Sequence, residues 1–412
     1  MCIISIIITY LILSFTLHPC TTIIIKSQFI SLNNPTPLST NAYILTPICL
    51  GNIHQHNCFP LILDINNKNT IIFSQTAHPH GIDPSSLLIT NITNTEGSIW
   101  KYDTCIKTNT CYTNIIFDSS HILYNTKLFI ASSLNIDITN TNYLGYLSLS
   151  CSEVIGEGNS LLQQLTTQNV TSSRNYGYTF TSQNEVNVFI DEHITNEVYN
   201  EYTFCKPGMR IGLIEANIYC RMDMLSYGTS HKQIQLPISN SMHVLFATRT
   251  EYMQGCTEGN DIFTIYITAS HNNCYTSEDK NKGTYLTCNN NVNINELPDI
   301  YFGIKGTSFE LVMKAIDIFD ITTGTSRLYV KRYCNFWVFD MNILKRYDMY
   351  IDYEQSLIGF KANFIFDDAT TTTMNNIYKL LISIFKLNIY IIIFGLIIIS
   401  ITTHITKHNA HC

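Results

Sequence analysis

Charged residues are scarce in this chain of 412 amino acids: Asp, Glu, Lys and Arg make up 13% of it, against 45% hydrophobic residues. The formal net charge is −7, so the sequence offers no electrostatic basis for binding nucleic acid. Glycine and alanine are also sparse, and we attach no function to that bias. A chain of this length and hydrophobicity can form two or three units with cores of their own.

Several functional motifs are missing as well. The cysteines form no CxxC pair, which leaves little support for a zinc site. The sequence contains no Ser/His/Asp signature and no phosphate-binding loop. Two His-x-His pairs, His54/His56 and His78/His80, could each present two imidazoles on one face of a strand. Both lie in loop-like sequence, so we predict no metal site and no cofactor.

Cysteine, by contrast, is plentiful. Eleven of the 14 cysteines lie between Cys49 and Cys334, a density typical of disulfide-bonded proteins of an oxidising compartment. The spacing allows a local disulfide between Cys49 and Cys58, which bracket a predicted turn. It also allows a small loop closed by Cys105 and Cys111. Two sequons predict glycosylation at Asn91 and Asn169.

Both ends of the chain carry apolar segments. Residues 1–21 resemble a signal peptide, although no Lys or Arg precedes the apolar core, and an uncleaved signal anchor is the alternative. Residues 383–402 are long and apolar enough for one membrane-spanning helix. We therefore predict a single-pass type I membrane protein of the secretory pathway, at the cell surface or in an internal membrane. Residues 367–382 would form a stalk and residues 403–412 a cytosolic tail.

The region between these segments has a β-rich pattern. Short runs of Ile, Val, Tyr and Phe alternate with clusters of Asn, Thr, Ser and Gly. One helix is predicted at Ser160–Leu165, where a capping serine precedes apolar residues at helical spacing. An apolar strand ends at Asp64, and another ends 183 residues later at Ala247, each before a polar turn. This repetition predicts a duplicated protein with lobes at 41–190 and 216–366, joined by a crossover at 191–215.

The stretch from Trp337 to Phe360 resembles the closing signature of the pepsin-family aspartic proteases. In that signature Trp-Ile-Leu-Gly-Asp is followed by Leu-Arg, Tyr-Tyr, Phe-Asp and Ile-Gly-Phe. The match has no gap, but Asp340 and Met341 stand in place of the family's Gly-Asp. Further upstream, Leu297-Pro-Asp-Ile300 and the strand Asn142–Leu149 are similar to two other family segments.

The resemblance covers about 320 residues and implies a mainly β, bilobal, pepsin-like fold followed by a C-terminal transmembrane helix. It also implies a disulfide between Cys288 and Cys334. A flap over the cleft would carry a tyrosine, for which Tyr102 is the candidate, stiffened by a Cys105–Cys111 loop.

The same resemblance implies a site with two carboxylates, one from an Asp-Thr/Ser-Gly turn in each lobe. Such a pair shares one proton and activates water. Asp64-Ile65-Asn66 keeps the acid of the first turn, but Ala247-Thr248-Arg249 has lost the acid of the second. A methyl group cannot carry a proton, and the two glycines are replaced as well.

The leading hypothesis is therefore a catalytically inactive homologue that binds peptide or protein in extended form. A working membrane-tethered aspartic endopeptidase is the first alternative, in which Asp223 or Asp261 would replace the missing acid. A surface receptor or structural antigen with a closed cleft is the second.

Overall fold

The computed structural model describes most of the chain between residues 22 and 366, and nothing outside that range. The chain divides into two compact units, Met1–Asn363 and Phe364–Cys412, and all the helices and strands below belong to the first. No helix among the described residues is long and apolar enough to cross a membrane. The predicted signal peptide, stalk, membrane span and tail all lie outside the described residues, as do 32–41, 53–54, 67–68, 84–90, 102–103, 135–141, 151–159, 193–195, 206–218, 230–231, 236–241, 249–252, 256–259, 271–272, 281, 290–292, 294–295, 305–306, 321–322 and 332–336.

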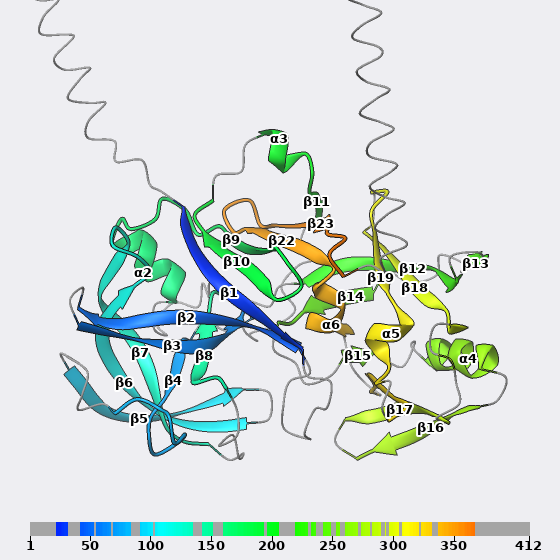
Figure 1. The fold of residues 1–412 in the computed structure, drawn as a ribbon, viewed down its shortest axis with the longest axis horizontal. Helices are drawn as coiled ribbons and strands as arrows, with labels where there is room; N and C mark the ends of the chain where they lie inside the picture. The colour runs from blue at the N-terminus through cyan, green and yellow to red at the C-terminus, as the bar shows by residue number, and fades with distance from the viewer. Residues whose placement is uncertain are drawn as a thin grey trace, which may run out of the picture. The chain divides into compact units, whose positions relative to one another are not determined.

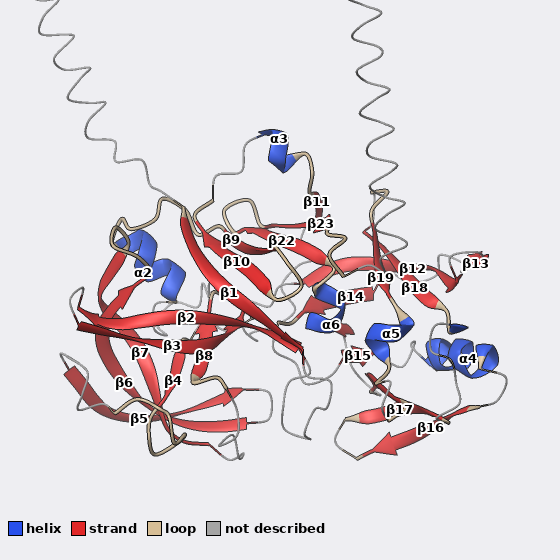
Figure 2. Ribbon diagram, viewed as in Figure 1, coloured by secondary structure: helices blue, strands red, loops and turns tan. Residues whose placement is uncertain are grey.

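The fold is mainly β, as the sequence predicts, and two sheets contain all its named strands (Figures 1 and 2). The first sheet has 13 strands, in the spatial order β11 (Thr203–Cys205), β23 (Leu357–Ala362), β22 (Tyr347–Asp352), β9 (Tyr176–Phe180), β10 (Glu185–Ile190), β1 (Ile23–Ser31), β2 (Ala42–Asn52), β3 (Gln55–Asp64), β8 (Gly145–Ser148), β4 (Ile71–Phe73), β7 (Ile122–Leu134), β6 (Thr104–Ile116) and β5 (Asn91–Lys101).

The second sheet has ten strands and lies within the second half of the sequence. Its spatial order is β16 (Cys274–Asp279), β17 (Gly283–Cys288), β20 (Thr325–Val330), β15 (Met253–Gly255), β21 (Trp337–Phe339), β14 (Met242–Phe246), β12 (Tyr219–Thr229), β18 (Asp299–Ile304) and β19 (Glu310–Met313), with β13 (Lys232–Gln235) paired to β12.

The described helices are short: α2 (Leu161–Thr167), α3 (Asn196–Tyr199), α4 (Asn260–Ala269), α5 (Ala315–Ile318) and α6 (Met341–Leu344). The predicted helix is confirmed as α2. Ser160 caps it by accepting a hydrogen bond from the backbone N–H of Gln163, at 3.3 Å. Leu161, Leu162 and Leu165 bury its apolar face.

Seven neighbouring strands of the first sheet have the same spatial order as seven neighbouring strands of the second sheet. The first set, β2-β3-β8-β4-β7-β6-β5, corresponds strand by strand to β12-β14-β21-β15-β20-β17-β16. In both sets the second strand is parallel to the third (β3 to β8, β14 to β21), and the third is antiparallel to a short fourth strand (β4, β15). We name these sets the first repeat and the second repeat. Their agreement supports the duplication predicted from the turns after Phe59–Asp64 and Met242–Phe246.

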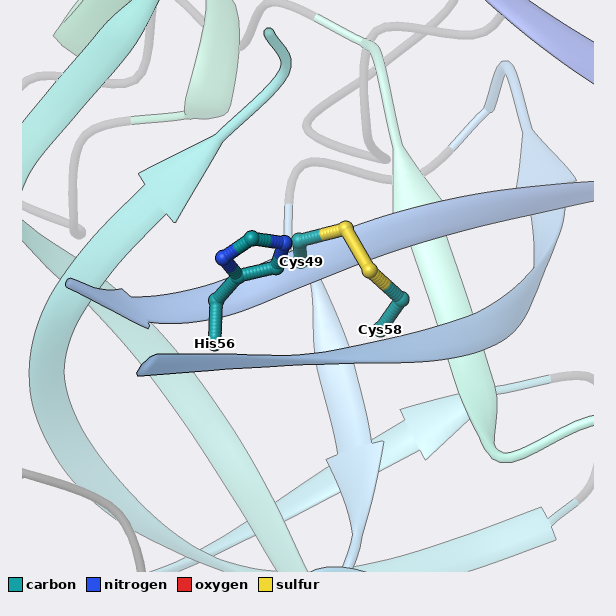
Figure 3. Close-up of side chains that lie close together, drawn as sticks. All are labelled: Cys49, His56 and Cys58. Carbon is teal, nitrogen blue, oxygen red and sulfur yellow. A yellow bond between two sulfur atoms is a disulfide. The ribbon is translucent and has the colours of Figure 1, made fainter. Parts of the chain in front are cut away.

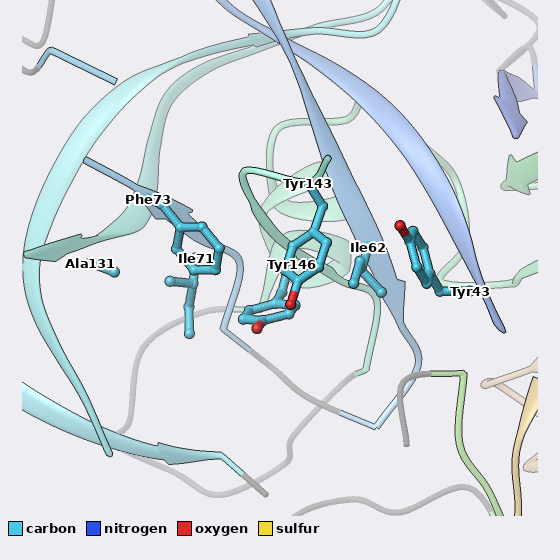
Figure 4. Close-up of a cluster of buried hydrophobic side chains, with 7 residues drawn as sticks. All are labelled: Tyr43, Ile62, Ile71, Phe73, Ala131, Tyr143 and Tyr146. Carbon is cyan, nitrogen blue, oxygen red and sulfur yellow. The ribbon is translucent and has the colours of Figure 1, made fainter. Parts of the chain in front are cut away.

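The core of the first repeat explains its strand pattern. Successive side chains of a strand point to opposite faces of the sheet, so every second residue of a strand lies on the same face. Side chains on one face of neighbouring strands are buried against each other. Phe73 and Tyr146 meet edge to face with ring centroids 5.4 Å apart. Figure 4 shows the whole cluster: Tyr43, Ile62, Ile71, Phe73, Ala131, Tyr143 and Tyr146.

The last two described strands, β22 and β23, cross the lobe boundaries that the sequence predicts. β22 and β23 (orange in Figure 1) lie within the predicted second lobe, yet β22 pairs with β9 of the first sheet. β1 precedes residue 41 and pairs with both β10 and β2. The first sheet therefore combines strands from the beginning, the middle and the end of the chain.

Candidate functional site

The turns that end β3 and β14 contact each other through the hydroxyl of Thr248. This hydroxyl donates a hydrogen bond to the backbone carbonyl of Leu63, at 2.7 Å, and accepts one from the backbone N–H of Ile65, at 3.3 Å. Thr248 is buried. One side chain of the second repeat thus satisfies two buried backbone groups on either side of Asp64.

A third hydrogen bond joins the two turns, and here the side chain comes from the first repeat. Asn66 donates its side-chain N–H to the backbone carbonyl of Phe246, at 2.6 Å. Ile65, which corresponds to Thr248 in the first repeat, has no hydroxyl with which to make this bond. The amide of the next residue, Asn66, therefore reaches across to the second repeat instead. We call these three hydrogen bonds the turn lock.

Asp64 lies inside the turn lock and is 1% exposed. Its Oδ1 accepts a hydrogen bond from the backbone N–H of Asn66, at 3.1 Å, as expected of an aspartate in a tight turn. Its backbone pairs with Ser148 of β8. The Ser148 hydroxyl donates to the carbonyl of Asn69, at 2.6 Å.

Ala247 occupies the corresponding position of the second repeat and is fully buried. Its backbone N–H bonds to the carbonyl of Phe339 at 2.9 Å, and its methyl packs with Leu245 and Val338. This position supplies no proton donor or acceptor from its side chain. Arg249, which follows, lies outside the described residues.

The second repeat does contain a buried acid, on the neighbouring strand. Asp340 follows β21 and corresponds to Ser148 of the first repeat, since Phe246 pairs with Phe339 as Leu63 pairs with Leu147. Burial raises the pKa of Asp340 to about 6, although Asn342 donates two hydrogen bonds to the carboxylate. Asp340 also caps α6.

Sequence reasoning named Asp340 only as a departure from the family signature. Asp223 and Asp261, which it offered as replacement acids, lie on β12 and α4, and their side chains lie outside the described part of the structure. The sequence signal that Asp340 does carry is its place directly after the apolar strand Trp337–Phe339, but its correspondence to Ser148 comes from the strand register.

The flap candidate Tyr102 falls in the sequence between β5 and β6, a hairpin that pairs Lys101 with Thr104. Tyr102 lies between them and outside the described residues. The predicted Cys105–Cys111 loop is wrong, because both residues belong to the single strand β6. Six residues of strand span about 20 Å, far beyond the reach of a disulfide. Cys111 is a free, buried thiol, and burial raises its pKa to about 12.

Disulfides join Cys49 to Cys58, Cys205 to Cys220 and Cys274 to Cys288. The first confirms the local pairing predicted from spacing. The third corrects the pairing of Cys288 with Cys334: Cys288 lies directly opposite Cys274 in the β16–β17 hairpin, which the sequence does not reveal. Cys334 lies outside the described residues.

The histidine pairs are not equivalent. His78 is buried and stacks on Phe73, and its Nδ1 accepts a hydrogen bond from the backbone N–H of His80. This is a structural arrangement within the turn after β4. His54 lies outside the described residues, whereas His56 is exposed on β3.

The two predicted glycosylation sites differ in what the structure describes. Asn169 is exposed in the turn after α2 and adopts a left-handed conformation, with φ of 55°. Asn91 begins β5, and its side chain lies outside the described part. Glycosylation at both remains a prediction.

Comparison with known proteins adds no relative. No protein-family model matches the chain. No curated protein matches it either. The family assignment therefore rests on the sequence motifs and stays a proposal.

Proposed function

We propose that this chain is a catalytically inactive homologue of the pepsin-like aspartic proteases and binds peptide or protein in extended form. It would be held in a membrane of the secretory pathway by residues 383–402, with its body on the lumenal or extracellular side. The proposal joins the motif resemblance of Trp337–Phe360 to the arrangement of the two turns.

The observation that carries the proposal is the turn lock around a single acid. The resemblance implies one acid in each turn, and the turns after β3 and β14 do meet through Thr248 and Asn66. Only the first supplies a carboxylate, because Ala247 stands in the second. Loss of one general acid or base costs about 10²–10⁴-fold in rate, and the shared proton cannot form without both acids.

Binding of an extended peptide is supported by the edge of the first sheet. β5 is the last strand in its order, so the backbone groups on its outer side have no neighbouring strand among those described. Peptides commonly bind by adding a strand to such an edge. Tyr102, the candidate flap residue, follows β5 directly in the sequence.

The test is to incubate the purified full-length protein with a peptide library at acid and neutral pH, and to measure both cleavage and retention. An active pepsin-like protease serves as the positive control. We expect retention without cleavage, with photo-crosslinks that map to β5 and β6.

Two results would contradict the proposal in different ways. Cleavage that a statine-type inhibitor blocks and that Asp64→Asn abolishes would establish the active endopeptidase instead. Absence of both cleavage and retention would favour a receptor or structural antigen with a closed cleft.

A further inference from the structure

Two of the disulfides each join directly opposed residues of neighbouring antiparallel strands. They differ in how far their cysteines are exposed to solvent. Cys49 lies directly opposite Cys58 in the β2–β3 pair, and Cys274 lies directly opposite Cys288 in the β16–β17 pair, with Cα–Cα distances of 3.9 and 4.0 Å. Cys274 and Cys288 are each only 4% exposed. Cys58 is exposed and Cys49 half-buried. The first pair is therefore more accessible to a reductant in solution than the second.

His56 distinguishes the exposed pair further. It lies two residues before Cys58 on β3, so both side chains point to the same face of the strand. Figure 3 shows its imidazole beside the Cys49–Cys58 bridge. The two sulfur atoms and a ring nitrogen of His56 all lie within 4.8 Å of one another.

We propose that Cys49, His56 and Cys58 form a redox-gated site for Zn²⁺, closed as a disulfide and opened by reduction. Zinc binds thiolate sulfur at about 2.3 Å and imidazole nitrogen at about 2.0–2.1 Å in a tetrahedron, which places two sulfur ligands about 3.8 Å apart. Rotation about the two Cα–Cβ bonds provides that separation while the strands stay in place.

The chemistry balances with a dithiol reductant as co-reactant. The reductant gives two electrons and two protons to the Cys49–Cys58 bond, which breaks into two thiols, and becomes a disulfide itself. Zn²⁺ then displaces both thiol protons, which pass to water, while neutral His56 donates a nitrogen lone pair. Three protein ligands leave a fourth position for water, so the bound metal is exchangeable.

The experiment uses Co²⁺ as a spectroscopic substitute for Zn²⁺ in the full-length protein. The protein is treated with a mild dithiol, freed of it without oxygen, and titrated with Co²⁺. We expect thiolate-to-cobalt charge-transfer absorption and tetrahedral visible bands in the reduced protein and none in the oxidised protein. Excess Zn²⁺ should abolish both. Alkylation followed by mass spectrometry should label Cys49 and Cys58 before Cys274 and Cys288.

Three variants separate this site from the other thiols of the chain. Cys49→Ser combined with Cys58→Ser should lose the absorption. His56→Ala, which keeps every cysteine, should weaken Co²⁺ binding at least about tenfold. Asn57→Ala, an exposed neighbour on the opposite face of β3, should bind as the unsubstituted protein does.

Absorption that persists in the double serine variant, folded by near-ultraviolet circular dichroism, would overturn the proposal. Equal affinity in His56→Ala and Asn57→Ala would remove His56 from the site. Absence of cobalt absorption from reduced protein with alkylatable Cys49 and Cys58 would refute metal binding altogether.

Discussion

In the first repeat the carboxylate of Asp64 ends β3, and the neutral Ser148 ends the neighbouring strand β8. In the second repeat the positions are reversed. The methyl of Ala247 follows β14, and the carboxylate of Asp340 follows the neighbouring strand β21. Each repeat thus keeps one buried acid at the end of its central parallel strands, but on different strands. The backbone arrangement of the two repeats is nevertheless the same, and the turn lock joins them. The strand order of the repeat therefore does not require an acid at the same strand end in both copies.

The largest expected effect comes from Ala247→Asp, which gives the second repeat the acid of the first. At pH 7 this substitution should lower the free energy of unfolding by about 3–5 kcal/mol, because it buries a charge without a partner. Burial raises the folded-state pKa of such a carboxyl above its unfolded value, so the loss should shrink as the pH falls from 7 to about 4 and should stay at its smallest value below that.

Urea unfolding from pH 3 to pH 7 measures this effect, with Ala247→Asn as the uncharged control of similar size. The asparagine variant should lose a constant amount of stability at every pH. If both variants show the same pH profile, position 247 is not buried away from solvent.

Asp340→Asn removes the acid that the second repeat already has. The pKa of Asp340 is raised from 3.8 to about 6 by burial, so the folded protein binds this proton more tightly than the unfolded chain does. The contribution of Asp340 to wild-type stability should therefore fall by about 3 kcal/mol as the pH rises from about 4 to above 6. The asparagine variant should lack this part of the fall.

The matched control for Asp340 is Ser148→Ala, at the corresponding position of the first repeat. Its difference from wild type should not depend on pH, because a serine does not titrate in this range. Parallel pH profiles for wild type and Asp340→Asn would show that Asp340 does not titrate with a raised pKa.

Thr248→Val tests the stronger part of the turn lock. The substitution keeps the shape of the side chain but leaves the carbonyl of Leu63 and the N–H of Ile65 without its hydroxyl. We expect a loss of about 2–3 kcal/mol in the free energy of unfolding at pH 7. Thr248→Ser retains the hydroxyl and should lose clearly less; an equal loss would assign the effect to packing.

Asn66→Ala tests the reciprocal hydrogen bond and should have the smallest effect. Loss of the donor to the carbonyl of Phe246 should cost about 1–2 kcal/mol in the same assay. The exposed Asn184→Ala is the control and should change stability by no more than about 0.5 kcal/mol. Equal effects of the two substitutions would mean that the bond to Phe246 contributes nothing.

Local pattern predicted the elements of this fold well. The apolar strands before the turns at Asp64 and Ala247 and the helix after Ser160 are where the sequence places them, because apolar periodicity and capping act within a few residues. Pairing between distant segments carries no such local signal. β22 joins β9 across about 170 residues, and Cys288 pairs with Cys274 of its own hairpin, and neither follows from spacing.

The candidate site divides in the same way. The places of Asp64 and Ala247 at strand ends followed from the sequence. The hydrogen bonds that Thr248 and Asn66 each make to the other turn could not be predicted from the sequence. Their prediction requires knowing that residues 183 apart in sequence meet in space. Asp340 was hidden for the same reason, since its correspondence to Ser148 emerges only from the strand register.

The most direct test of the account is a double-mutant cycle between positions 64 and 247 at pH 7, from the unfolding free energies of wild type, Asp64→Asn, Ala247→Asp and the double variant. If the two turns place these positions together and the chain carries one acid where a protease needs two, Asp64→Asn should recover about 1–3 kcal/mol of the loss caused by Ala247→Asp. Additive losses, within about 0.5 kcal/mol, would contradict the paired turns on which the proposed function rests.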